Sequence, residues 1–243
     1  MQYNFAMAIL SKITFESNSR VLDIGCGDGA ITNKISQIVN DGFVTGTDIS
    51  PQMIDFASKE YSNRNNLRFL QMDACKNIFC DQFDIITSFN CLHWVRDQKK
   101  ALVGISNAAS GGAQIALFLS HKKSTHHFVL DEICSNDRWK HYFDKIISPR
   151  SFFHLCSYKA MVIQSGLKVI EIVEQEMTYT YSSKEQLINF FSAAGSQLGQ
   201  IPELKKKEFL NDFATEFLRQ IAAQDDKEIP VSFWCLQVIA RKG

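Results

Sequence analysis

The chain has 243 residues, of which 45% are hydrophobic, so it can bury a sizeable core, and we expect a single domain with an insertion. Lysine and arginine together equal aspartate and glutamate, 26 against 26, which excludes a strong field for nucleic acid or an anionic membrane. No apolar run reaches the roughly 20 residues of a membrane span, and the first residues do not have the pattern of a secretory signal.

The first informative stretch runs from Val21 to Gly29. Apolar β-formers lead into three glycines in five positions, and helix-forming residues follow from Ala30, which predicts a buried strand, a tight turn and a helix. The glycines let a ligand approach the backbone closely. Their G-x-G-x-G spacing matches the dinucleotide fingerprint G-x-G-x-x-G only in a relaxed form, with Ala30 in place of the last glycine. Asp23, two residues before the first glycine, suits a ligand with a cationic amine better than one with a pyrophosphate.

A second short apolar strand over residues 43–50 contains Asp48, 23 residues after Gly25. This is close to the spacing at which an acidic residue meets ribose hydroxyls in a βαβ unit, and a carboxylate can accept both hydroxyl protons. Ser50 as N-cap and Pro51 at the first helical position predict that a helix begins there. Its apolar residues recur at helical spacing and predict a stripe that faces the core: Met53, Ile54, Ala57 and Tyr61.

Two further strands are predicted over residues 67–72 and 83–89. The first ends at Asp73 and Ala74, and the second leads into Asn90 and the segment Cys91–Trp94. Candidate ligand positions therefore follow four successive strands. Open α/β sheets bind their ligands at the carboxyl ends of the strands, so we expect these positions to form one site.

The second half is predicted to contain a fifth strand ending at Ser120, a helix around 158–165 that stops at Gly166, and strands at 167–173 and 231–240. Residues 121–156 are polar and aromatic. Apolar faces around 187–194 and 210–221 predict amphipathic helices. We expect a core of about 18–120, 157–180 and 230–243, with a helical and aromatic lid formed by about 121–156 and 182–228.

The sequence V-L-D-x-G-x-G-x-G at residues 21–29 resembles the first motif of the class I S-adenosylmethionine-dependent methyltransferases at every fixed position. The resemblance implies an α/β fold with a doubly wound, mainly parallel seven-stranded Rossmann-like sheet and a helical lid insertion. It implies S-adenosyl-L-methionine as cofactor, with Asp73 near the adenine amino group. Motif and strand ends together give the expected cofactor-binding residues: Asp23, Gly25, Cys26, Gly27, Asp48, Ile49, Met53, Asp73, Ala74 and Asn90.

The segment Leu92–Trp94 is similar to that of a branch that methylates small-molecule carboxylates. This branch includes trans-aconitate, juvenile hormone acid and malonyl-carrier-protein methyltransferases. Its members carry an N-terminal helix that closes over the cofactor, and this chain begins at about the point where that helix would end. Either the lid is shorter here or the natural chain is longer, and a role of Gln2 in holding substrate stays open.

The candidate catalytic residues are His93 and Trp94. Methyl transfer from a sulfonium is an in-line displacement that needs alignment and a dry site, and an ionised carboxylate acceptor needs no general base. If the acceptor is a hydroxyl, a phenol or an amine, His93 is the candidate base, although a hydrogen-bonding or packing role is favoured. Trp94 either holds the substrate, by stacking or through its indole N–H, or packs in the core.

No metal site is expected, because the spacing of His121, His126 and His127 matches no common zinc pattern, and Lys122 and Lys123 between them favour a solvated loop. The seven cysteines form an odd, scattered set, which predicts free thiols in a reducing cytoplasm, with Cys26 a small filler of the turn. The expected partner is a small molecule, for which an organic acid is the candidate, and not nucleic acid. A nicotinamide-dependent dehydrogenase and a non-catalytic S-adenosylmethionine-binding protein are the alternatives, and neither the acceptor nor the oligomeric state can be predicted.

Overall fold

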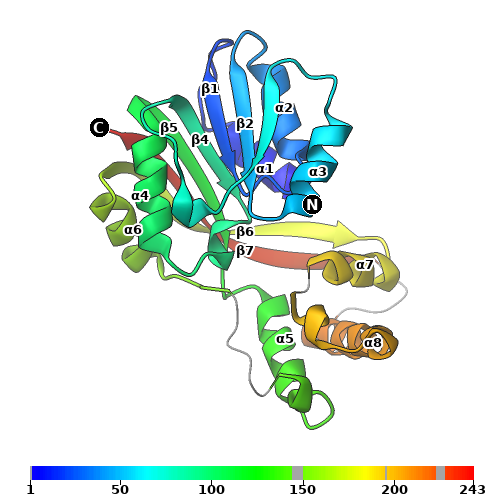
Figure 1. The fold of residues 1–243 in the computed structure, drawn as a ribbon. Coiled ribbons are helices and arrows are strands. Elements are labelled where there is room, and N and C mark those ends of the chain that lie inside the picture. The colour runs from blue at the N-terminus through cyan, green and yellow to red at the C-terminus, as the bar shows by residue number, and fades with distance from the viewer. Residues whose placement is uncertain (1, 144–149, 195, 223–227) are drawn as a thin grey trace. The chain divides into compact units, whose positions relative to one another are not determined.

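The computed structural model describes residues 2–143, 150–194, 196–222 and 228–243. Its central feature is a seven-stranded sheet with the order β3-β2-β1-β4-β5-β7-β6 (Figure 1). The strands are β1 (Arg20–Ile24), β2 (Phe43–Asp48), β3 (Leu67–Gln71), β4 (Phe83–Phe89), β5 (Ala109–Ser120), β6 (Leu167–Tyr181) and β7 (Ile229–Lys242).

Neighbouring strands from β3 to β5 are parallel, and β7 pairs with β5 in the antiparallel direction. The chain order reverses between β1 and β4. Strands β2 and β3 extend the sheet on one side of β1, whereas β4 and β5 extend it on the other side. Such a switch point leaves a crevice beyond the carboxyl ends of the strands, where open α/β sheets bind ligands.

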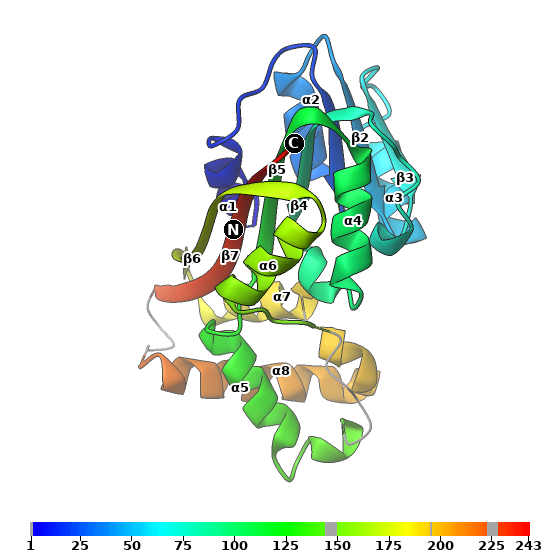
Figure 2. The same cartoon turned by 90° about the vertical axis from the view of Figure 1, so that its left-hand side faces the viewer.

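Helices cover both faces of the sheet. The helices α4 (Gln98–Ala108) and α6 (Leu155–Gln164) lie on one face, and α1 (Gln2–Leu10), α2 (Ala30–Ile38) and α3 (Pro51–Glu60) lie on the other (Figures 1 and 2). The remaining helices are α5 (Thr125–Ser135), α7 (Lys184–Ala194) and α8 (Glu203–Gln220), with short 3₁₀ turns η1 (Ala74–Lys76), η2 (Leu92–Trp94), η3 (Lys140–Tyr142) and η4 (Ser196–Gln200).

The chain divides into two compact units. Unit 1 comprises residues 1–120, 149–175 and 235–243, and unit 2 comprises residues 121–148 and 176–234. Unit 1 therefore contains every strand end that the sequence marked as a ligand position. Its core lies between the sheet and the pair α4 and α6, where Leu22, Ile86, Leu102, Tyr158 and Val162 are fully buried.

Unit 2 is held together by aromatic side chains of its helices. The ring of Trp139 meets the ring of Phe209 edge to face at 5.2 Å, and Phe191 meets Phe213 at 4.5 Å between centroids. The indole N–H of Trp139 donates to Asp212 at 2.8 Å, so the buried ring also has its polar atom satisfied. The aromatic rings of unit 2 therefore pack against one another.

The predicted fold class, a doubly wound and mainly parallel seven-stranded sheet, is confirmed. Ser50 caps α3 by accepting from the backbone N–H of Met53, with Pro51 as the first helical residue. The predicted core stripe of α3 holds for Ile54 and Ala57, which are buried, but it is wrong for Met53, which is 45% exposed. Within the described part of the chain, no helix is long and apolar enough to span a membrane.

Three further elements differ from the predictions. Strand β6 continues to Tyr181, because the alternating residues from Met177 onward keep the strand period. Helix α4 has no predicted counterpart. His126 and His127 lie on helix α5, not in a solvated loop, and His127 is buried, although Lys122 and Lys123 just before the helix are exposed as expected.

Candidate active site

The glycine turn after β1 is closely packed on one side and open above its middle. Gly25 and Cys26 both donate their backbone N–H groups to the carbonyl oxygen of Thr47, at 2.7 and 2.9 Å, which holds the turn against the end of β2. Gly25 has a φ of 74°, and a Cβ added to it would lie 2.2 Å from the side chain of Cys91. Gly27 also has a positive φ, of 54°, but a Cβ there would meet no atom within 4 Å. The turn therefore leaves space for a ligand at Gly27.

Asp48 at the end of β2 closes the turn from the other side. Its Oδ2 accepts from the backbone N–H of Gly27 at 3.0 Å, and its Oδ1 accepts from the N–H of Ser50 at 2.9 Å. Each carboxylate oxygen has a second lone pair, so two vicinal hydroxyls can still be accepted. Since the side chain is only half-buried, the geometry fits the predicted ribose contact.

Two large apolar side chains beside Asp48 are exposed. Ile49 is 66% exposed and Met53 is 45% exposed, although both lie within five residues of the carboxylate. Exposed apolar groups at the carboxyl edge of a sheet are suited to the faces of a flat ring. Met53 therefore belongs to this exposed surface and not to the core stripe predicted for α3.

Asp73 and Ala74 follow β3 and lie next to this surface. The backbone N–H of Met72 donates to the carbonyl of Asp48 at 2.9 Å, which ties the ends of β2 and β3 together. The carboxylate of Asp73 caps η1 by accepting from the N–H of Cys75 at 2.9 Å, and both Asp73 and Ala74 are half-buried. The structure thus brings the predicted ribose and adenine positions together.

Asn90 begins the loop after β4. Its φ of 53° lies in the left-handed region, which asparagine tolerates better than most residues, and its N–H donates to Phe118 of β5 at 3.0 Å. This turn brings Cys91 against Gly25, so the loop after β4 and the glycine turn are in direct contact.

Asp23 lies below this surface, not on it. Its carboxylate is buried, and it accepts hydrogen bonds from the hydroxyls of Thr32 at 2.6 Å and Thr87 at 2.8 Å. Burial raises the pKa of Asp23 to about 6, against the two hydroxyl donors that oppose the rise. A direct contact with a ligand amine stays a prediction, because the carboxylate of Asp23 is buried in this structure.

His93 in η2 is buried and held at two points. Its Nδ1 accepts from the backbone N–H of Ser120 at 3.3 Å, and its carbonyl oxygen accepts from the N–H of Ser151 at 2.7 Å. Burial lowers the pKa of His93 to about 3, with a further contribution from the nearby charge of Arg150. The neutral ring therefore carries its proton on Nε2 and acts as a donor at that atom.

Trp94 is half-buried, and the cationic side chain of Arg150 lies over its ring. The guanidinium carbon of Arg150 lies 4.6 Å from the centroid of the Trp94 ring, and the ring of His93 lies 5.2 Å from the same ring. Arg150 and Ser151 were not predicted, because they lie more than 50 residues from η2 in a segment with no motif. The only signal in the sequence was a cation two residues before an aromatic pair, Phe152 and Phe153.

Cys26 is buried and its thiol pKa is raised by burial, which agrees with its predicted role as a filler of the turn. Among the described residues, no three His, Cys, Asp or Glu side chains are grouped so that they could hold a metal ion.

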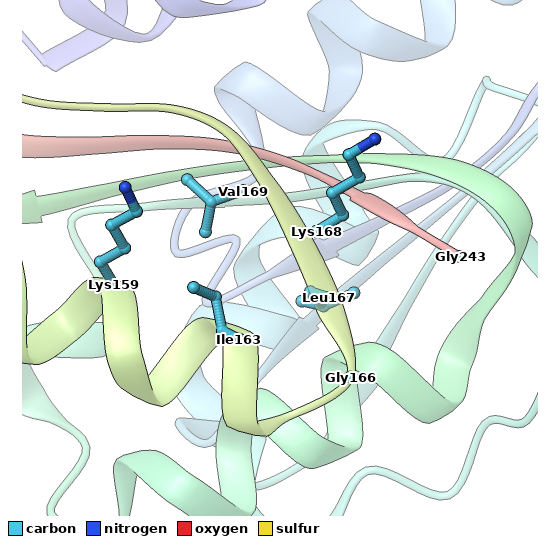
Figure 3. Close-up of a pocket in the computed structure, with 7 residues that line it drawn as sticks. All are labelled: Lys159, Ile163, Gly166, Leu167, Lys168, Val169 and Gly243. Carbon is cyan, nitrogen blue, oxygen red and sulfur yellow. The ribbon is translucent and has the colours of Figure 1, made fainter.

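A separate hollow of about 400 Å³ lies in unit 1 beside Gly166 (Figure 3). Lys159, Ile163, Lys168 and Val169 contribute side chains to it. Gly243 also lines it, just beyond the end of β7, where Arg241 pairs with Gln114, six residues before the carboxyl end of β5. The hollow is therefore at the opposite edge of the sheet from Asp48 and Trp94.

Comparisons with known proteins find methyltransferases among the relatives of this chain. The family described as methyltransferase domain matches residues 21–112, which run from β1 to β5. A putative methyltransferase of Invertebrate iridescent virus 6 is 31% identical over 216 residues, which cover 87% of this chain and 80% of that protein. The juvenile hormone acid O-methyltransferase of Bombyx mori is 30% identical over 208 residues, or 80% of this chain and 72% of that protein.

Among solved structures, a phosphoethanolamine N-methyltransferase of Haemonchus contortus, in complex with S-adenosylhomocysteine, superposes with a TM-score of 0.64 at 20% identity. The match covers 98% of this chain and 52% of that one. At this identity the likeness shows a shared fold.

Proposed function

We propose that the methyl acceptor of this protein is the carboxylate of a small organic acid. The proposal starts from the family, because the chain belongs to the class I S-adenosylmethionine-dependent methyltransferases. The cofactor of this family is S-adenosyl-L-methionine, which supplies an electrophilic methyl group on its sulfonium. In the reaction proposed here, a carboxylate oxygen forms a bond to the methyl carbon while the carbon–sulfur bond breaks. The products are a methyl ester and S-adenosylhomocysteine.

We further propose how the described residues hold the cofactor. Asp48 accepts the two ribose hydroxyls, and Ile49 and Met53 pack against the adenine ring, whose amino group lies near Asp73 and Ala74. The open side of Gly27 admits the part of the ligand beyond the ribose. Asp23 contributes indirectly, because its buried carboxylate binds the hydroxyls of Thr32 and Thr87 beneath the glycine turn. Asn90 forms the turn that leads from β4 to η2. These roles are supported by hydrogen bonds to Asp48 and by the exposure of the apolar pair.

The observation that carries the carboxylate proposal is the pairing of a neutral His93 with the cation of Arg150 over Trp94. A hydroxyl, phenol or amine acceptor needs a base, and a histidine with a pKa lowered to about 3 is a weak one. A carboxylate is already ionised near neutral pH, and a guanidinium is a suitable partner for it. The relative from Bombyx mori is a juvenile hormone acid O-methyltransferase, a name that indicates an acid as its substrate.

The first experiment is a titration of the protein with S-adenosylmethionine, followed by a screen of small carboxylic acids with tritiated methyl donor. Arg150→Met is then compared with Arg96→Met, because Arg96 is exposed only two residues after Trp94. Loss of a charge-assisted hydrogen bond costs about 2 kcal/mol, so we expect the KM for the acid to rise about 30-fold in Arg150→Met. Arg96→Met should leave this KM unchanged, and both variants should bind the cofactor normally.

Equal effects of the two arginine variants would contradict the proposal. The alternative, an uncharged acceptor with His93 as base, predicts a rate that falls as this base becomes protonated and that is lost in His93→Gln. A non-catalytic protein would bind S-adenosylmethionine and transfer no methyl group to any acceptor. The lid role expected for residues 121–156 and 182–228 stays a prediction, and so does a cytoplasmic location.

A further inference from the structure

The side chain of Gln98 bridges the two ends of the turn η2. Its Nε2 donates to the carbonyl oxygens of both Leu92 and Val95, each at 2.5 Å. These two carbonyls lie at the start and just past the end of the turn that carries His93 and Trp94. A single amide nitrogen therefore connects both ends of the turn to the first residue of α4.

The other atom of the same amide is also bonded. The hydroxyl of Tyr158 on α6 donates to Oε1 of Gln98 at 3.1 Å, and Tyr158 is fully buried while Gln98 is 4% exposed. Burial raises the pKa of Tyr158, so its hydroxyl keeps the proton that it donates. This hydrogen bond fixes which way the amide points, and the NH2 group must then face the turn.

Only glutamine supplies this combination at position 98. A glutamate would place an oxygen where two carbonyl oxygens require a donor, and a methionine of similar length would leave both carbonyls without this donor. A buried polar group with all its partners is costly to lose, so the amide holds the backbone of η2 in one place. The packing of α4 and α6 alone does not require a polar residue here.

We infer that Gln98, oriented by Tyr158, is a positioning residue that sets where Trp94 and His93 stand toward the methyl acceptor. The inference rests on the proposed function for the identity of the acceptor, but the placement of Trp94 is measurable without any acceptor. We expect the effect mainly at η2, because the backbone N–H of Gly25 and the carboxylate of Asp48 are held by hydrogen bonds that do not involve this turn.

The test uses full-length protein labelled with 5-fluorotryptophan, which has three signals because the chain has three tryptophans. Trp94→Phe assigns the Trp94 signal. In Gln98→Met we expect that signal to shift or broaden while those of Trp139 and Trp234 stay in place. Tyr158→Phe, which keeps both amide donors, should give a smaller change of the same signal. The affinity for S-adenosylmethionine should change less than twofold in both variants, and the KM for the acid should rise about tenfold in Gln98→Met.

Ile105→Ala is the matched control, since Ile105 is a buried apolar residue of the same helix that lies away from η2 in sequence. It should lower the melting temperature and leave the Trp94 signal in place. Equal disturbance of all three signals in Gln98→Met, or an unchanged Trp94 signal, would overturn the inference. If Gln98→Met fails to fold, Tyr158→Phe decides alone by the same readout. Failure of the wild type to methylate any acid would refute the proposed function and leave the signal of Trp94 as the test of this inference.

Discussion

Around the ends of β1 and β2 the site consists mainly of backbone, whereas around η2 side chains hold the backbone in place. The glycine turn is fixed by its own N–H groups on Thr47 and by Asp48 on Gly27. The η2 turn is fixed by the Gln98 amide, by the His93 ring on Ser120 and by residues 150 and 151. The first region therefore depends on conformations that few residues can adopt, and the second depends on contacts between distant elements.

The largest expected effect comes from adding a methyl group in the first region. Gly25→Ala places a Cβ 2.2 Å from Cys91 at a φ of 74°, so both overlap and backbone strain act. Together these cost about 4 kcal/mol, and we expect the affinity for S-adenosylmethionine to fall by roughly three orders of magnitude in a calorimetric titration. Gly111→Ala, where a Cβ meets nothing within 4 Å, is the control and should bind normally. Normal binding by Gly25→Ala would refute the backbone view of this region.

A somewhat smaller effect concerns Asp23, which accepts hydrogen bonds from Thr32 of α2 and Thr87 of β4. Its pKa is raised from 3.8 to about 6 in the folded protein. The folded state therefore holds this proton more tightly, and stability from this group is present below pH 4 and lost as the pH rises through 6. A shift of about two units corresponds to about 3 kcal/mol of unfolding free energy.

Denaturant unfolding between pH 4 and 7 measures this effect. The wild type should lose stability relative to Asp23→Asn as the pH rises. Asp84, whose pKa is lowered by Arg20, contributes with the opposite sign, but its stabilisation is lost mainly as the pH falls below its ordinary pKa of 3.8, outside this range. Because the Asp84 pair is largely exposed, its share is below about 1 kcal/mol. Parallel curves for the wild type and Asp23→Asn would contradict the raised pKa.

The smallest of the three effects is expected for Asp48→Asn. The amide keeps the size of the side chain but replaces one charged acceptor by a donor, either toward Gly27 or toward Ser50. The loss of charged hydrogen bonds is worth about 2 kcal/mol, so the affinity for S-adenosylmethionine should fall about 30-fold. Asp55→Asn on the exposed side of α3 should have no effect. If the two variants bind alike, Asp48 does not hold the ribose.

The sequence predicts the first region well because its signals are local. The strand, the glycine turn and the Ser50–Pro51 cap are each written in fewer than ten consecutive residues, and the structure has all three. The carboxyl ends of parallel strands then bring distant residues together without further information.

The second region could not be predicted in the same way. Gln98 and Tyr158 are separated by 60 residues, and neither belongs to a recognisable motif. Arg150 and Ser151 reach η2 from the segment just before α6, a helix that packs against α4. Burial also changed the interpretation of single residues: His93 has a pKa too low for a base near neutral pH, and Asp23 lies under the turn.

The hydrogen bond from the Ser151 N–H to the His93 carbonyl joins two main-chain groups, so it does not depend on the side chain of either residue. Natural or laboratory evolution can therefore exchange the side chains at 93, 94, 150 and 151 while the segment that presents them stays attached to η2. A library randomised at these four positions, with Gln98 and the glycine turn kept, offers a route to new acceptor preferences on an unchanged cofactor site.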